Sequence, residues 1–516
     1  MFTLFFAGRD FAPNLTMADG RNVQDFLQGH YFGAMARVAH VLADEDNVVG
    51  FDTLNEPNMG MIGSEDLTRR SNYMRMGPSP TWFESLLLGE GLSQRVPFYE
   101  PALIKQGTVT LNPDHVRAWK QGHACVWRTH SVWGYGAQGE PVLLEKDYFR
   151  WRRIPGGGRV KVDTERDYFV PFVLAFKRAV NEGAGRRRAA GVGGSPGTEA
   201  PAASRYLVFL DRDTDFEDPH ASHCPLGSEL GQDPAAIEGL VWAPHWYPLL
   251  PLHSRACLPL TPACIQSCQS HRYDLVPLAT KSFRAWIGIT RAGRFPVALG
   301  NRRLVADYEA QLLKLRECGA ALGAGKGVPT LIGEIGIPFD FNGGEAYRTG
   351  DYGLQISAMD TTMRALERAL LSATLWNYAP DNTNEHADGW NGEDLSIYSR
   401  DQVVAGNEGD AFAGGRALHA IIRPYAQRCA GTPLAMDFDM LTRVFSLRFQ
   451  HDPAVPPTAP TLLFVPFFQY PEPPRVEVSD GSYVFDQHAQ TLEFYHNGSK
   501  SSIHTLILRP ARDTDD

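Results

Sequence analysis

Apolar and polar positions recur along the chain with two different periods, and the changes of period predict its helices and strands. Residues 22–45 carry apolar side chains at intervals of three and four, which is typical of an amphipathic helix with one buried face. Residues 47–54 form a short apolar run that leads directly into Asn55, Glu56 and Pro57. This run predicts a strand whose C-terminal end is polar.

The same strand–helix rhythm returns several times. The segments predicted as helices are 167–180, 302–322 and 359–370. The segments predicted as strands are 206–210, 239–247, 329–335 and 372–378, with 2–6 as a candidate first strand. Alternation of this kind indicates an α/β fold with a parallel sheet.

The pattern changes after a further predicted helix that ends at Arg423-Pro424, because proline interrupts helical hydrogen bonding. Short β-type runs follow at 443–449, 461–468, 482–485, 491–496 and 503–508. These runs predict an antiparallel β-sandwich domain at 429–516, preceded by a barrel domain at 1–428.

The predicted fold class is α/β: a TIM (β/α)8-type barrel followed by the C-terminal β-sandwich. A barrel of about 250 residues uses about 30 residues for each βα unit. The segment ahead of residue 47 is too short for the units expected there, so the sequence predicts a barrel that lacks its first strands. We also expect a large insertion at 58–165 and a Gly/Ala-rich linker at 183–204.

Composition narrows the possible functions. The 516 residues include 43% hydrophobic and 21% charged residues, and the formal net charge is −10. Because a phosphate backbone would be repelled by this charge, we expect no nucleic-acid partner. Neither a transmembrane run nor a signal peptide is visible, which favours a cytoplasmic or vacuolar location. The sequence makes no prediction of oligomeric state.

Seven cysteines are scattered through the chain, an odd number that argues against a secreted disulfide framework. One cluster, Cys257, Cys264, Cys268 and His271, contains four residues of types that bind zinc. Its spacing lacks the paired cysteines of common structural zinc sites. We therefore expect no metal and no organic cofactor.

Two glutamates end predicted strands, where barrel enzymes place their catalytic residues. Retaining hydrolysis of a glycosidic bond needs one carboxylic acid to protonate the leaving oxygen and one carboxylate to attack the sugar. Glu56 and Glu334 are the candidates for these two roles. Taken alone, Glu56 also fits a simple turn, and Glu334 also fits a buried ion pair.

Three further candidates end strands. His245 and Tyr247 close the run 239–247, and Trp376 closes the run 372–378. A single histidine or tryptophan at such a position is more often a core residue than a ligand. The order of all these strand ends along the chain is what favours a common site.

The segments that contain these residues resemble glycoside hydrolase family 5, and in particular its fungal glucosylceramidase and steryl-β-glucosidase branch, which is related to endoglycoceramidases. The similar segments are FDTLNEPNMG (51–60), LIGEIGIPFD (331–340), LWNYAPDN (375–382), DGWNGEDLSIYSRD (388–401) and GGRA…RPYA (414–426). The family also has an arginine, and commonly a histidine, on its early barrel strands. No residues of this chain plainly match them.

The resemblance implies a role for each candidate. Glu56 would be the general acid/base and Glu334 the nucleophile. Asn55 would bind the hydroxyl next to the anomeric carbon, and Trp376 would be the platform under the sugar. His245 and Tyr247 would surround the two carboxylates.

The implied activity is a retaining β-glycosidase that hydrolyses the β-glucosidic bond of a glycolipid by double displacement, with glucosylceramide and steryl glucoside both open as substrates. An endo-β-glycanase acting on polysaccharide, and a truncated non-catalytic barrel that binds carbohydrate or lipid, are the alternatives. Aromatic residues of the insertion could line a lipid groove or form a core of their own. They are Trp82, Phe83, Trp119, Trp127, Trp133, Tyr135, Phe149 and Trp151.

Overall fold

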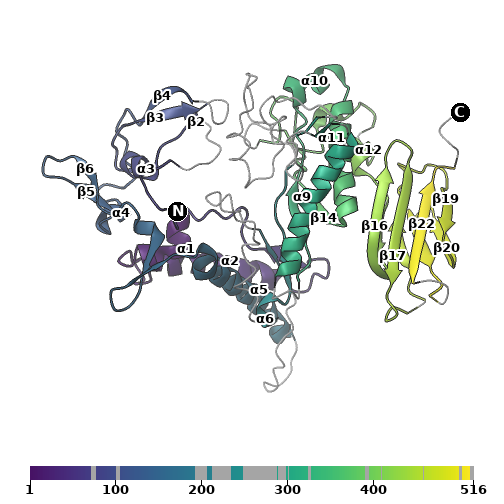
Figure 1. Ribbon diagram of the computed structural model, residues 1–516, viewed down its shortest axis with the longest axis horizontal. Helices are drawn as coiled ribbons and strands as arrows, with labels where there is room; N and C mark the ends of the chain where they lie inside the picture. Colours follow the sequence, from purple (N-terminus) through teal and green to yellow (C-terminus); the bar gives the residue numbers. More distant parts are fainter. Residues whose placement is uncertain are drawn as a thin grey trace. The chain divides into compact units, whose positions relative to one another are not determined.

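The computed structural model describes most of the chain (Figure 1). The described residues are 1–70, 77–99, 105–191, 206–211, 234–247, 287–288, 298–299, 301–322, 327–389, 394–407, 409–456, 458–498 and 502–511. They form two compact units: the first comprises the described residues up to Pro244 together with 317–322 and 327–330, and the second comprises all the others. The predicted cysteine–histidine cluster at 257–271 lies outside the described residues.

The first unit contains a three-stranded parallel sheet in the order β1-β9-β10. Its strands are β1 (Gly50–Asp52), β9 (Leu207–Leu210) and β10 (Leu240–Trp242). Phe51 pairs with Val208, and Trp242 continues into a parallel bridge with Thr330. The predicted strands around 47–54, 206–210 and 239–247 are therefore confirmed as parallel neighbours.

Helices of the first unit pack together through aromatic side chains. These helices are α1 (Phe2–Phe11), α2 (Val23–Val41), the π-helical turn Glu165–Phe169, α5 (Val170–Gly191) and α6 (Pro234–Ile237). Asn22 caps α2, because its side chain accepts a hydrogen bond of 2.9 Å from the Gln24 amide. Tyr31 of α2 stacks on Phe172 and Phe176 of α5 with ring centroids 6.0 Å apart, and Figure 1 shows these two helices side by side.

The expected first strand at 2–6 is wrong, since these residues begin α1. Phe6, Ala7 and Phe11 are buried, and the helix has a kink at Ala7. The Phe6 ring packs edge-on against Phe172 at 5.2 Å. A short apolar run fits both a strand and a buried helix. Packing against α5 favours the helix at these residues.

The expected linker also begins as helix. α5 continues to Gly191, so residues 183–191 are helical, and 192–204 lie outside the described residues. Gly183 is needed at its position because an added Cβ would lie 2.3 Å from the carbonyl oxygen of Ala36 in α2. Close packing of two helix backbones thus explains one glycine that looked like part of a flexible segment.

The insertion at 58–165 consists of small β elements and short helices. They are β2 (Gly77–Pro78), α3 (Trp82–Gly89), β3 (Gln94–Tyr99), β4 (Lys105–Leu111), α4 (Val126–Thr129), β5 (Trp133–Tyr135), β6 (Pro141–Leu143), the 3-10 turn Tyr148–Arg150, β7 (Trp151–Arg153) and β8 (Arg159–Lys161). β2, β3 and β4 form an antiparallel sheet, and the last four strands form two hairpins. Thr81 and Glu84 close a capping box at the start of α3.

Most aromatic residues of the insertion belong to a core. Trp127, Trp133 and Phe149 are buried, and Trp127 packs edge-on against Phe149 at 4.9 Å. Trp82, Phe83 and Trp119 are partly buried against the same hydrophobic cluster. The structure therefore favours the core interpretation of these side chains over the lipid groove.

The second unit begins with βα elements and a parallel strand pair. Its elements are β11 (Ile287–Gly288), β12 (Ala298–Leu299), α9 (Asn301–Ala321), β13 (Leu331–Ile335), α10 (Phe341–Thr349), α11 (Gly353–Ala369), β14 (Ser372–Leu375), the 3-10 turn Arg400–Gln402 and α12 (Leu418–Ile421). β13 and β14 are parallel, with Leu331 opposite Ser372. Both predicted strands and both predicted helices of this region are confirmed. The strands that the structure describes do not close into a barrel.

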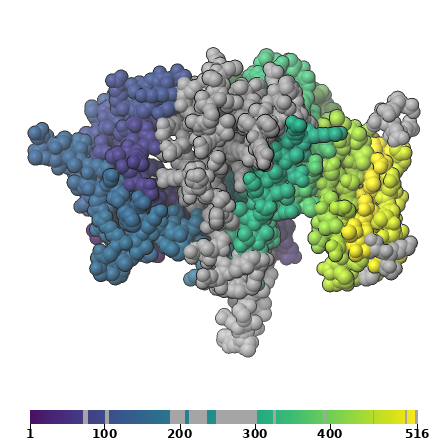
Figure 2. All heavy atoms as spheres, in the orientation of Figure 1, coloured from purple at the N-terminus to yellow at the C-terminus, as the bar shows by residue number. Residues whose placement is uncertain are grey.

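The C-terminal domain of the second unit has two four-stranded antiparallel sheets, in the orders β15-β18-β21-β20 and β16-β17-β22-β19 (Figure 1). Its strands are β15 (Tyr425–Arg428), β16 (Gly431–Asp439), β17 (Val444–His451), β18 (Thr461–Phe464), β19 (Arg475–Val478), β20 (Ser482–Asp486), β21 (Thr491–Tyr495) and β22 (Ile503–Arg509). Buried Phe445, Leu463 and Leu506 belong to its core. In the space-filling view the yellow-green to yellow strands form one closely packed body (Figure 2).

A buried arginine connects this β-domain to α11. Arg423 donates to Glu367 through Nε at 2.6 Å and to Asp360 through Nη1 at 2.6 Å, and a further nitrogen donates to the Phe438 carbonyl at 2.8 Å. Burial raises the pKa of Glu367, although the guanidinium of Arg423 opposes that effect. The predicted end of the helix at Arg423-Pro424 thus lies at a buried junction between α11 and the β-domain. Among the described residues, no helix has the length and apolarity needed to cross a membrane.

Candidate active site

Glu334 is the fourth residue of β13, near the C-terminal end of a parallel strand. Its side chain is 15% exposed, so the carboxylate is largely enclosed but still reachable from solvent. The neighbouring Ile332 and Ile335 are buried in the hydrophobic core of this unit, which fixes the strand. Catalytic groups occupy this end of the strands in α/β barrels.

Two side chains from residues 245–247 surround this carboxylate. The Tyr247 hydroxyl donates a hydrogen bond to Oε1 of Glu334. The Nδ1 atom of His245 lies 3.5 Å from Oε2, and its side chain is 13% exposed. Each carboxylate oxygen therefore has its own neighbour, which restricts rotation of the carboxyl group.

The backbone of this short segment explains why both side chains reach Glu334. His245 forms a parallel bridge with Glu334, and the Trp246 amide donates to the Glu334 carbonyl at 2.9 Å. Trp246 is buried, and its ring packs edge-on against Tyr308 at 5.3 Å. Side chains alternate along extended backbone, so burying Trp246 turns His245 and Tyr247 to the opposite face.

Trp376 follows β14, the strand that pairs with β13, and its side chain is half-buried. Its amide donates to the Ile335 carbonyl at 2.8 Å. An added Cβ on Gly336 would lie 2.2 Å from the Trp376 carbonyl oxygen. The glycine after Glu334-Ile335 is thus required for the close approach of the segment that contains Trp376.

Residues 388–389, 394–401 and 414–417 support the loop after β14. Arg416 is fully buried and forms a two-pronged ion pair with Asp394, which also accepts a hydrogen bond of 2.8 Å from Asn382. Asn377, next to Trp376, donates to Asp388 at 3.1 Å. The polar residues in these segments are therefore partners of one another and hold the backbone beside Trp376.

The segment that carries Asn55 and Glu56 lies in the first unit, just after β1. Both side chains are exposed, and Glu56 has a φ of 43°, a left-handed conformation that non-glycine residues seldom adopt. The Glu56 amide donates to Oδ2 of Asp211 at 2.7 Å. Such backbone outliers cluster at functional sites.

Two residues of the first unit support this segment and were not predicted from the sequence. Asp211 directly follows β9 and is buried, so a lone acid after a predicted strand was the available signal. The Tyr31 hydroxyl donates to the Thr53 carbonyl at 2.5 Å. Burial, with a smaller effect of Asp52, raises the pKa of Tyr31 to about 12, so this phenol remains a donor at neutral pH.

The structure thus brings three predicted site residues, Glu334, His245 and Tyr247, into contact, and it places Trp376 on the adjoining strand end. Asn55 and Glu56 belong to the other compact unit, where the Glu56 amide donates to Asp211.

The chain is similar to several known proteins. The sequence profile of the glycoside hydrolase family 5 C-terminal domain matches residues 423–507. The glucosylceramidase of Rhizopus delemar is 30% identical over 96% of this chain and 66% of its own length. The ergosteryl-beta-glucosidase of Saccharomyces cerevisiae is 26% identical over 96% of this chain and 69% of its own length.

The chain is also similar to a solved structure. Sterylglucosidase 1 of Cryptococcus neoformans matches 99% of this chain and 71% of its own chain, with a TM-score of 0.78 and 25% sequence identity. Residues 423–507 thus match glycoside hydrolase family 5, and the chain as a whole is similar to the proteins named above. Its resemblance to the fungal glucosylceramidases and steryl glucosidases of that family is confirmed. The chain spans 66% of the Rhizopus protein, somewhat less than two thirds of its length.

Proposed function

We propose that the chain is a retaining β-glycosidase that releases glucose from a glycolipid, either glucosylceramide or a steryl glucoside. The observation that supports this most directly is the Glu334 carboxylate at a strand end, hydrogen-bonded by Tyr247 and adjoined by His245. Relatives named glucosylceramidase and ergosteryl-beta-glucosidase support the glycolipid substrate. The proposed reaction needs neither a metal ion nor an organic cofactor.

In the proposed double displacement, an oxygen of Glu334 attacks the anomeric carbon while Glu56 protonates the oxygen that leaves with the lipid. The bond to the lipid breaks as the glycosyl-enzyme bond forms. Glu56, now ionised, then removes a proton from water, which attacks the same carbon and frees Glu334. Two inversions restore the original β configuration.

Tyr247 and His245 have positioning roles in this proposal. A donor on Oε1 holds the carboxyl plane and leaves lone pairs of Glu334 directed at the sugar, which lowers the entropic cost of attack. Asn55 would bind the hydroxyl next to the anomeric carbon. Trp376 would offer an indole face to the apolar face of the pyranose, a contact that aromatic rings make well.

The proposed fold is the (β/α)8-type barrel of the family, with β1, β9, β10, β13 and β14 among its strands. Their parallel pairing within each unit and the match to the Cryptococcus structure support it.

The test is glucose release from detergent-dispersed glucosylceramide and steryl glucoside by the purified chain, beside its Glu334→Gln variant. We expect release by the parent chain and none by the variant, and the lipid hydrolysed faster identifies the substrate. Cleavage of a cellulose-type polymer without release from either lipid would favour an endo-β-glycanase. A folded chain that binds the lipids but hydrolyses nothing would favour a non-catalytic barrel.

A further inference from the structure

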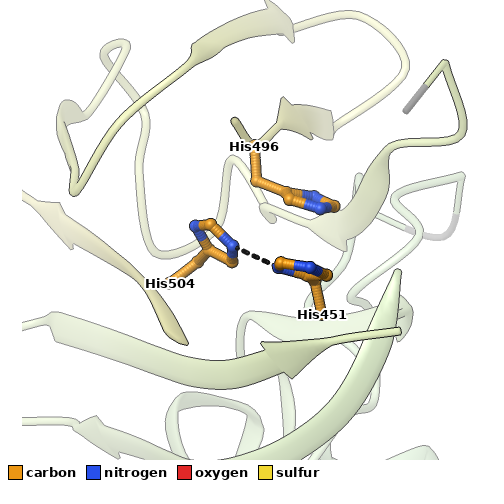
Figure 3. A group of neighbouring side chains, drawn as sticks. All are labelled: His451, His496 and His504. Carbon is orange, nitrogen blue, oxygen red and sulfur yellow. Dashed lines mark hydrogen bonds between the residues drawn. The ribbon is translucent and has the colours of Figure 1, made fainter. Parts of the chain in front are cut away.

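Three histidines gather at one end of the C-terminal β-sandwich (Figure 3). His451 ends β17, His504 lies in β22, and His496 follows β21. One ring nitrogen from each lies within 4.8 Å of those of the other two. β17 and β22 belong to one sheet and β21 to the other, so the group spans both layers of the sandwich.

The three rings are packed together rather than spread over the surface. His451 and His496 stack with centroids 5.1 Å apart, and His496 and His504 lie 4.5 Å apart. His504 is fully buried, while the other two are partly buried. Protonating such a group would place like charges side by side, which is unfavourable without an anion for each ring.

Asp480 fixes which nitrogen of His504 is available. Its Oδ2 lies 2.8 Å from His504 Nδ1, and its Oδ1 accepts from the Asn497 amide at 2.7 Å. Burial opposes ionisation of Asp480, but these hydrogen bonds lower its pKa overall. A carboxylate on Nδ1–H leaves Nε2 with a free lone pair, the arrangement typical of histidines that bind metals.

The available nitrogen of His504 faces the second imidazole. His504 Nε2 lies 3.0 Å from His451 Nδ1, the dashed contact in Figure 3. Two nitrogens bound to one tetrahedral zinc ion at about 2.05 Å lie about 3.3 Å apart. If the two rings moved slightly apart, an ion would therefore fit between these nitrogens. The Nδ1 proton of His451 would then move to solvent or to Nε2 of the same ring.

The third imidazole has an unused acceptor. His496 Nδ1 is buried and lacks a hydrogen-bond partner among the described residues. A buried polar atom without a partner is costly unless a ligand satisfies it.

From these contacts we infer that His451, His496 and His504 bind one first-row transition-metal ion of the Zn²⁺ class, with water in the remaining position. The ion would join the two sheets at the end of the sandwich. This site is independent of the proposed glycosidase reaction. It departs from the expectation of a chain without metal.

The test is zinc content of the full chain, measured by mass spectrometry after incubation with Zn²⁺ and dialysis. We expect about one histidine-dependent ion per chain, lost by roughly tenfold or more in His451→Gln and in His496→Gln. The matched control is His488→Gln, an exposed histidine of the same domain that lies outside the group. Any zinc held by Cys257, Cys264 and Cys268 would be the same in every variant, so the comparison between variants cancels it.

Two further measurements separate a metal ligand from a merely structural histidine. Zn²⁺ should raise the midpoint of thermal unfolding of the C-terminal domain by roughly 4–8 °C in the parent chain and not in the two variants. Asp480→Asn should weaken zinc binding by about 10- to 100-fold while the chain stays folded. Equal zinc content in the parent chain, both ligand variants and the control would overturn the proposal, as would a parent chain that neither retains zinc nor is stabilised by it.

Discussion

Glu334 lies near the end of the parallel strand β13 and Glu56 follows the parallel strand β1, but the groups around them differ. The carboxylate of Glu334 is mostly enclosed, with Tyr247 on one oxygen and His245 near the other. Glu56 has an exposed side chain, and its backbone amide donates a hydrogen bond to Asp211. A nucleophile needs a fixed carboxyl plane, whereas an acid/base group must exchange a proton with the leaving oxygen and then with water. The contrast therefore matches the two proposed roles.

Replacing the proposed nucleophile should have the largest effect. Glu334→Gln removes the attacking oxygen but keeps the size of the side chain, so we expect turnover to fall by at least about 10⁴-fold on every β-glucoside. Rates on the natural lipid and on an aryl glucoside measure this. A variant that retained even a tenth of parent activity would assign the nucleophile elsewhere.

Replacing the proposed acid/base should depend on the leaving group. Glu56→Gln is expected to lower hydrolysis of the lipid glucoside by about 10²- to 10⁴-fold. An aryl glucoside with an acidic phenol leaves without protonation, so its first step should be nearly unchanged, visible as a burst of phenol in rapid-mixing kinetics. Equal losses of rate on both substrates would contradict the assignment of different roles to Glu56 and Glu334.

Removing the Tyr247 hydroxyl should have a moderate effect. Tyr247→Phe deletes one hydrogen bond to a charged group, a contact worth about 1.5–3 kcal/mol, so turnover should fall by roughly 10- to 100-fold. Tyr483→Phe, an exposed tyrosine in the C-terminal domain, is the matched control. If both variants matched the parent in steady-state rates, the enclosed surroundings of Glu334 would have no catalytic importance.

The smallest effect is expected at the anchor of Glu56. Asp211→Asn keeps an acceptor for the Glu56 amide but loses the negative charge, so lipid hydrolysis should fall by less than about tenfold. The fall should be smaller still for the aryl glucoside, which needs no acid. A larger loss on the aryl substrate than on the lipid would show that Asp211 acts through some other residue.

The sequence predicted the features that depend on local pattern. Strand ends such as those before Asn55 and around Glu334 follow a short apolar run, and their polar residues interrupt that run visibly. The start of α1 was mispredicted because Phe2, Phe5 and Phe6 fit either period, and contacts with α5 decide between them.

Contacts between segments that are distant in the sequence could not be predicted from local pattern. Arg416 with Asp394, and Arg423 with Glu367, look like ordinary surface charges in the sequence, yet each pair is buried. The same holds for the histidine group of the β-domain. Its members have no motif spacing, and only the register of β17 with β22 and the packing of β21 bring them together.

The most direct test of the central claim is to trap the glycosyl-enzyme. An activated 2-deoxy-2-fluoro-β-glucoside slows the second displacement, because fluorine destabilises the positively charged transition state. Peptide mass spectrometry should then find the sugar attached to Glu334 in the parent chain, and no adduct in Glu334→Gln. A sugar attached to another carboxylate, or hydrolysis of the lipid by Glu334→Gln at the parent rate, would contradict the account.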